Sequence, residues 1–260
     1  MCSRITWRLA KGSLSGSSDC AAGALVESRL GPVQLCRKSG IRHIRISMKP
    51  FGAVVVAYPY HCSEKEALRF LEQKEEWIIK ARKRLEKIEK QLTRFGPDTS
   101  FTTRFHTLSL VCSSEVTHFV LKQGHPSMRL LYPEGVDFAS EQAQQIVRKA
   151  LTEILRIEAT GYLPDRVKRL AAIHGLTPAG VTIKDNSSRW GSCSLKNAIH
   201  LNLHLMRLPE ALSDYVILHE LAHFTQKNHG PAFWRLLDIY CNGQARSLDK
   251  GLKAYRIAIY

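Results

Sequence analysis

The stretch YVILHELAHFTQKNHG at residues 215–230 restricts the fold more than any other part of the sequence, because it places three histidines and one glutamate in a mostly apolar run. Apolar residues surround the helix that the spacing predicts, which indicates that this helix is buried. A buried carboxylate without a partner costs on the order of several kcal/mol, so Glu220 requires a cation or strong hydrogen-bond donors beside it. The chain is therefore expected to fold around a polar centre.

The spacing of these polar residues predicts a metal site. Residues four apart on an α-helix differ by about 40°, so His219 and His223 can reach one ion, with Glu220 beside them. This is the arrangement of His-Glu-x-x-His zinc hydrolases, in which the glutamate activates a zinc-bound water. The alternative is a pair of core histidines bonded to the backbone and a salt-bridged glutamate. We expect one Zn²⁺, with Glu220 as the general base.

A third zinc ligand is expected, because a catalytic zinc usually has three protein ligands and a water. No glutamate follows Glu220, and His229 is the next histidine after the motif. An unbroken helix would point His229 about 80° away from the histidine face, so the helix must end first. The Gly230-Pro231 pair suits such a turn. The other readings are a solvent-exposed His229 and a carboxylate ligand from Asp238 or Asp249.

The whole sequence predicts an α+β protein in three parts. Residues 1–29 are Ser/Gly-rich with a few basic residues, and we expect a disordered extension rather than a transit peptide. Residues 30–139 are expected to be β-rich, with one long helix over 64–94 that a capping box at Ser63 opens. Residues 140–260 are expected to form the domain that holds the histidine motif.

Helical periodicity dominates this last part. A helix is expected over residues 140–174, interrupted near Gly161 and Pro164 because both residues weaken helices. The helix with the histidine motif is expected to start at Pro209. Two strands are expected between these helices, at residues 180–185 and 198–206.

The charge balance favours anionic partners. The chain has 38 Lys and Arg against 23 Asp and Glu, a formal charge of +15. Such a charge attracts polyanions, but the basic residues of the 64–94 helix alternate with glutamates, which is typical of a solvated face. We expect at most weak, non-specific binding of nucleic acid beside a peptide or protein substrate.

The cysteines and the hydropathy point to a soluble protein of the cytoplasm. The seven cysteines are scattered and form no CxxC pair, so no disulfide framework or cysteine zinc site is expected. No apolar run approaches the 18 or so residues of a membrane span. We therefore expect a reducing compartment and no membrane association.

Three segments together resemble a known family. RWGSCS at 189–194, IHLNLHL at 199–205 and PEALSDYVILHELAHFTQKNHGPAFW at 209–234 resemble the YgjP-like metallopeptidases, a minimal zincin group related to the SprT-like proteases. The resemblance implies an α+β zincin-like core and a zinc metallopeptidase. It also implies the site residues His219, His223 and His229 as ligands and Glu220 as general base.

A substrate site is expected beside the metal. By the same resemblance, the strand over 198–206 is the candidate to pair with an extended peptide. Arg189, Trp190 and Asn202 are candidate substrate-binding residues, since Arg189 can bind a carboxylate or phosphate and Trp190 can pack the cleft. The alternative is a structural turn anchored by a buried tryptophan.

Two other functions compete with the peptidase. The same metal site could serve a nucleotide phosphohydrolase, although the sequence has no P-loop or Gly-rich phosphate cradle. A basic nucleic-acid-associated protein with a structural zinc is the second. A structural zinc is normally closed by four protein ligands, and Glu220 would have no task there.

Overall fold

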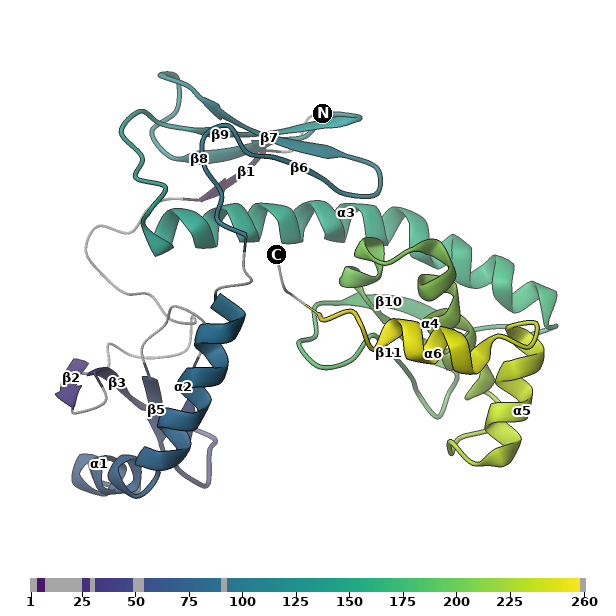
Figure 1. The fold of residues 1–260 in the computed structure, drawn as a ribbon, viewed down its shortest axis with the longest axis horizontal. Helices are drawn as coiled ribbons and strands as arrows, with labels where there is room; N and C mark the ends of the chain where they lie inside the picture. Colours follow the sequence, from purple (N-terminus) through teal and green to yellow (C-terminus); the bar gives the residue numbers. More distant parts are fainter. Residues whose placement is uncertain (1–3, 8–24, 29–30, 49–53, 90–92, 258–260) are drawn as a thin grey trace. The chain divides into compact units, whose positions relative to one another are not determined.

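The computed structural model of the chain describes residues 4–7, 25–28, 31–48, 54–89 and 93–257 (Figure 1). The chain divides into two compact units, one of residues 10–93 and Tyr260, the other of residues 1–9 and 94–259. This division falls near residue 94, whereas the sequence predicts one at residue 140. The difference arises because a sheet formed by residues 100–132 packs in the same unit as the histidine motif. Each unit is described by itself.

The first unit contains a four-stranded sheet with the order β2-β3-β5-β4. Its strands are β2 (Leu25–Ser28), β3 (Gly31–Arg37), β4 (Arg45–Ser47) and β5 (Val54–Tyr58). Strands β3 and β5 run parallel, and the outer pairs are antiparallel. Val33, Leu35, Val54 and Val56 are buried at alternate positions, as expected where one face of a sheet covers a core.

Two helices complete this unit, α1 (Glu64–Gln73) and α2 (Glu75–Glu89). The predicted capping box is confirmed: the Ser63 N–H donates to Glu66 Oε2 at 2.7 Å, and the Glu66 N–H donates to Ser63 Oγ at 3.3 Å. The single helix expected here is divided at Lys74, which has non-helical backbone angles. Leu71 of α1 and Ile78 of α2 both belong to the core on the sheet.

The second unit begins with a five-stranded sheet of order β1-β8-β9-β7-β6. Its strands are β1 (Arg4–Trp7), β6 (Ser100–Thr102), β7 (Thr107–Cys112), β8 (Phe119–Lys122) and β9 (Ser127–Tyr132). Strands β7 and β9 are parallel, and the other pairs are antiparallel. The strand β1 therefore brings the start of the chain into a sheet made mostly of residues 100–132.

A single helix of 33 residues, α3 (Glu141–Ile173), runs along this sheet (Figure 1). The interruption expected near Gly161 and Pro164 is wrong, because the helix continues through both. Pro164 removes one hydrogen bond to the carbonyl of Thr160, but Thr160 is exposed, so water can reach that carbonyl. The buried Leu163 and Val167, before and after Pro164, stabilise the helix across the weak point.

Glu158 of α3 holds the loop between β6 and β7. Its side chain is fully buried, and its Oε1 accepts hydrogen bonds from Thr103 Oγ1 at 2.5 Å and from the Phe105 N–H at 3.0 Å. The Nδ1 of His106 lies 2.9 Å from the same oxygen. One carboxylate therefore satisfies three groups of a loop that is about 50 residues away in the sequence.

We expect Glu158→Ala to lower the free energy of unfolding by about 2–4 kcal/mol, because it leaves part-buried donors without their acceptor and opens a cavity in place of a buried side chain. The matched control is Glu153→Ala on the same helix, whose side chain is 32% exposed beside Arg156. That change should cost less than about 1 kcal/mol. Thermal and urea unfolding of both variants measure the difference, and equal losses would contradict the anchoring role.

The histidine motif lies in the rest of this unit. A three-stranded sheet has the order β10-β12-β11. Its strands are β10 (Gly180–Lys184), β11 (Gly191–Cys193) and β12 (Ala198–Asn202). A short 3-10 helix, η1 (Leu203–Arg207), follows, and the helices are α4 (Glu210–Ala222), α5 (Pro231–Tyr240) and α6 (Ala245–Leu252). The strand expected over 198–206 thus ends at Asn202, whose Oδ1 accepts a hydrogen bond from the His204 N–H and so caps η1.

The disordered extension expected over residues 1–29 is replaced at two places by strands, β1 and β2. The rest of that extension, residues 1–3, 8–24 and 29, lies outside the described residues. Cys36 on β3 is disulfide-bonded, whereas Cys62, Cys112, Cys193 and Cys241 are free thiols. In the described ranges, no helix is long and apolar enough to cross a membrane.

Candidate metal centre

Helix α4 carries the histidine motif and is buried on most of its surface. It begins directly after Pro209, as expected. Its buried positions are Leu212, Ser213, Tyr215, Val216, Ile217, Leu218, Glu220, Leu221 and Ala222. The helix packs against α3, α5 and α6 and against the strand β11, so few positions on it can face an open site.

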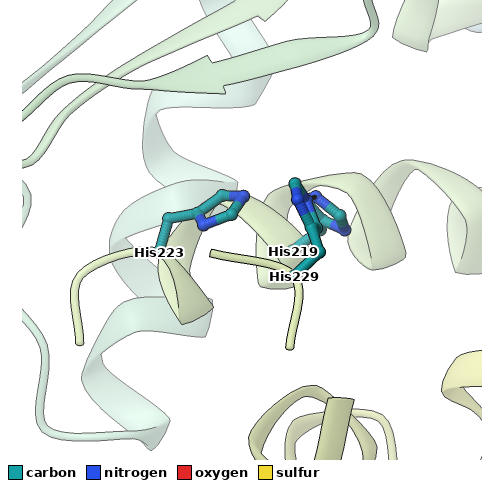
Figure 2. Close-up of side chains that lie close together, drawn as sticks. All are labelled: His219, His223 and His229. Atoms are coloured by element: carbon teal, nitrogen blue, oxygen red, sulfur yellow. Dashed lines mark hydrogen bonds between the residues drawn. The ribbon is translucent and has the colours of Figure 1, made fainter. Parts of the chain in front are cut away.

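Three histidines meet at the end of this helix (Figure 2). His219 lies in the last turn of α4, His223 is its C-cap residue, and His229 lies in the connection to α5. One ring nitrogen from each lies within 4.8 Å of the others, and the Nε2 atoms of His219 and His229 are 3.0 Å apart. The helix therefore ends early enough to bring His229 back to the histidine face, six residues after His223.

The surroundings fix the orientation and the charge of these rings. The Nδ1 of His223 lies 2.8 Å from the Gln226 carbonyl oxygen, so it carries the proton and leaves Nε2 as the free acceptor. Burial lowers the pKa of His223, and burial with the other two histidines lowers the pKa of His219 to about 4. The buried ring of Phe233 lies 4.7–4.9 Å from all three imidazoles. Two of the rings are thus held neutral, the form that binds metals.

Glu220 lies between α4 and the edge of the small sheet. It is 6% exposed, and burial raises the pKa of its carboxyl to about 7. Its side chain lies directly against Gly191 of β11: a Cβ atom at Gly191 would stand 2.7 Å from Glu220 Oε1. A carboxyl with a pKa near neutrality can both take up and release a proton at pH 7.

The family of the chain follows from comparison with known families. A model of the YgjP-like metallopeptidase domain matches residues 42–255, which is most of the chain. The chain belongs to this family. The sequence-based resemblance is therefore confirmed, and membership of a metallopeptidase family implies a divalent metal.

Two crystal structures are similar to this YgjP-like chain. One is the metallopeptidase zymogen of Pyrococcus abyssi abylysin, 25% identical, and the other is that of Methanocaldococcus jannaschii jannalysin, 27% identical. Each match covers 35% of this chain, 91% and 92% of the respective archaeal chains, and has a TM-score of 0.31. No curated protein matches the chain.

The histidines of this YgjP-like chain fit a divalent metal. A tetrahedral Zn²⁺ with Zn–N bonds of about 2.0–2.1 Å separates its ligands by about 3.4 Å, and the three ring nitrogens here lie within 4.8 Å of one another. Two imidazole nitrogens only 3.0 Å apart need either a shared proton or a shared cation. The donor set is all nitrogen, which suits zinc better than magnesium or calcium.

The two aspartates considered as alternative ligands are not part of the histidine cluster. Asp238 Oδ1 accepts the Ala245 N–H at 3.1 Å at the start of α6. Asp249 accepts hydrogen bonds from Tyr215 OH at 3.3 Å and from Lys253 Nζ at 2.7 Å. Among the described residues, the only cluster with metal-ligand geometry is that of the three histidines.

The candidate substrate residues differ in their surroundings. Arg189 is exposed and Trp190 is half-buried, so both remain accessible. Asn202 is fully buried, and its Nδ2 donates to the carbonyl oxygens of Asn186 and Arg189 at 2.7 and 2.8 Å. The side-chain amide of Asn202 is therefore taken up by these carbonyls and is not open to a substrate. It holds the loop that leads into β11.

The strand expected to pair with a peptide is also not available. β12 is the central strand of its sheet, parallel to β10 on one side and antiparallel to β11 on the other. A central strand has no free backbone edge for a substrate. The free edge next to Glu220 belongs to β11 instead.

Proposed function

We propose that the protein is a zinc-dependent peptidase that holds one Zn²⁺ with His219, His223 and His229 and uses Glu220 as its general base. The observation that carries this proposal is the convergence of three imidazole nitrogens within 4.8 Å of one another. Glu220, the neighbour of His219 on α4, supplies the fourth functional group.

The proposed roles of the zinc ion and of Glu220 follow from their chemistry. Zn²⁺, when bound, supplies a Lewis acid that polarises a peptide carbonyl and lowers the pKa of a water toward about 7. The carboxylate of Glu220 accepts the proton of the attacking water and returns it to the leaving amine. Only 6% of Glu220 is exposed, so its carboxyl is largely shielded from bulk solvent.

The edge of β11 is the proposed binding site for the peptide backbone. The Asn202 N–H donates to the Trp190 carbonyl, and the Ser194 N–H donates to the Ala198 carbonyl. Because the bonded positions of an antiparallel ladder alternate, the N–H and C=O groups of Gly191 and Cys193 point away from β12. An extended peptide can pair with these groups beside Glu220, which would favour backbone over side-chain recognition.

The phosphohydrolase alternative gains no support from a cavity in this unit. A cavity of about 600 Å³ lies between the β6–β7 loop and the start of α4. Arg104 and Arg207 line it, but none of the three histidines does. A nucleotide in this cavity would therefore lie away from the proposed metal.

The nucleic-acid alternative rests on the charge of +15 alone. A structural zinc would leave the buried Glu220 without a role, whereas a hydrolytic site uses it. Weak, non-specific binding of nucleic acid and a location in the cytoplasm both stay predictions.

A substrate panel tests the proposal. Zinc-loaded protein is incubated with denatured casein, a library of unstructured peptides, nucleoside triphosphates and oligonucleotides, and products are identified by mass spectrometry. We expect peptide-bond cleavage that a chelator abolishes and that added zinc restores. Release of phosphate or pyrophosphate without any peptide cleavage would favour the phosphohydrolase instead.

A further inference from the structure

The side chain of Glu220 lies directly against Gly191, a residue that has no side chain. A Cβ atom at Gly191 would lie 2.7 Å from Oε1, 2.9 Å from Cγ and 3.1 Å from Cδ of Glu220. Carbon atoms in contact stay about 3.5–4.0 Å apart. The whole side chain of Glu220, not only its tip, therefore occupies the space that any other residue at this position would need.

The backbone at Gly191 gives no other reason for a glycine. The residues with a positive φ, where glycine is favoured, are at other positions among the described residues. Gly191 lies in the regular strand β11, where glycine is less stable than residues with a side chain. The missing side chain is thus explained by the space that Glu220 takes.

Glu220 cannot easily yield this space. It lies in the last turn of α4, a helix that is buried on most sides, and only 6% of the residue is exposed. A shift that clears Cγ must rotate the side chain about the bonds nearest the helix. Such a rotation moves the carboxylate by far more than the few tenths of an ångström by which tight contacts usually relax.

We propose that Gly191, on the edge strand β11, is a positioning residue. Because Gly191 has no side chain, it leaves the space in which the side chain of Glu220 lies, and so keeps the carboxylate where it acts on the substrate. This inference rests on the proposed function, because it gives a purpose to the position of the general base. The same edge strand therefore offers backbone groups to the substrate and sets the location of the base.

Kinetics of Gly191→Ala test the role in the reaction. We expect kcat on denatured casein to fall by at least about 100-fold, the lower range for a general base, while KM changes less than about threefold and bound zinc stays at the wild-type level. The matched control is Gly180→Ala in β10 of the same sheet, where a Cβ would meet nothing within 4 Å. That variant should keep the wild-type kcat. A wild-type kcat in Gly191→Ala overturns the proposal.

A double-mutant cycle tests the contact without any activity assay. One added methyl group that overpacks against the buried side chain of Glu220 should lower the melting temperature of Gly191→Ala by about 2–10 °C. In the Glu220→Ala background the space is empty, so Gly191→Ala should then lower the melting temperature by less than about 1 °C. An equal loss in both backgrounds overturns the proposed contact. If no variant, wild type included, cleaves peptides while the cycle shows this coupling, the contact stands and the proposed peptidase function fails.

Discussion

Glu220→Gln is expected to lower peptide hydrolysis by about 10²- to 10⁴-fold while the bound zinc is retained, since a positioned general base contributes on that order. Glutamine has nearly the same size and shape, so the packing against Gly191 is preserved. The amide cannot take a proton from water at neutral pH. The measurements are kcat on denatured casein and zinc content by mass spectrometry.

Glu210→Gln provides the control for this change. Glu210 stands on the same helix, but its side chain is 59% exposed and 3.0 Å from Arg166 Nη2. The substitution should leave kcat within about twofold of the wild type, because a surface ion pair of this kind contributes little. Unaltered hydrolysis in Glu220→Gln would exclude Glu220 as the base, whatever the natural substrate.

Removal of a histidine ligand is expected to have the second large effect, on the metal itself. His219→Ala or His223→Ala should reduce bound zinc from about one ion per chain to near zero after dialysis. Loss of a residue that only hydrogen-bonds to a metal ligand usually weakens metal binding by about 10- to 100-fold. We expect His229→Ala to weaken zinc binding by more than this. Competition with a coloured chelator measures these affinities.

Two aspartate variants make this test selective. Asp238→Ala and Asp249→Ala should keep wild-type zinc, because both carboxylates accept hydrogen bonds from other residues and neither belongs to the histidine cluster. Loss of zinc in Asp238→Ala together with its retention in His229→Ala would reverse the ligand assignment.

The local part of the site could be predicted from the sequence. The four-residue spacing of His219 and His223 determines their common helix face by geometry alone. A helix end before His229 was expected and is present, but α4 already ends at Ala222, and the turn-forming pair Gly230-Pro231 begins α5 instead. The exact end, with His223 itself as the C-cap, could not be predicted, because it depends on hydrogen bonds such as that of His223 Nδ1 to the Gln226 carbonyl.

The errors come from contacts between distant segments. Alternating apolar residues identify β12 as a strand, but an alternation cannot distinguish a central strand from an edge strand. Asparagine is a residue type that can bind a substrate, but the side-chain amide of Asn202 donates hydrogen bonds to backbone carbonyls 16 and 13 residues away. Pro164 has a low helix propensity, but the packing of α3 keeps the helix continuous through this residue.

The contact between Gly191 and Glu220 could not be predicted from the sequence for the same reason. The sequence contains 16 glycines, and nothing in the local pattern marks one of them as the neighbour of a glutamate 29 positions later. That relation exists only after β11 has packed against α4.

The C-terminal end of α4 lies at the metal centre. The dipole of this helix therefore adds an electrostatic preference for a cation to that of the three histidine ligands. Aligned peptide dipoles leave roughly half a negative charge at the C-terminus of a helix, and the effect is confined to the last turn. His219 lies in that turn and His223 caps it. The backbone itself therefore favours a cation here by about 0.3–1 kcal/mol. The same three imidazoles gathered at the beginning of a helix would face the opposite field, so chain polarity as well as residue identity makes this end of α4 suited to a positive ion.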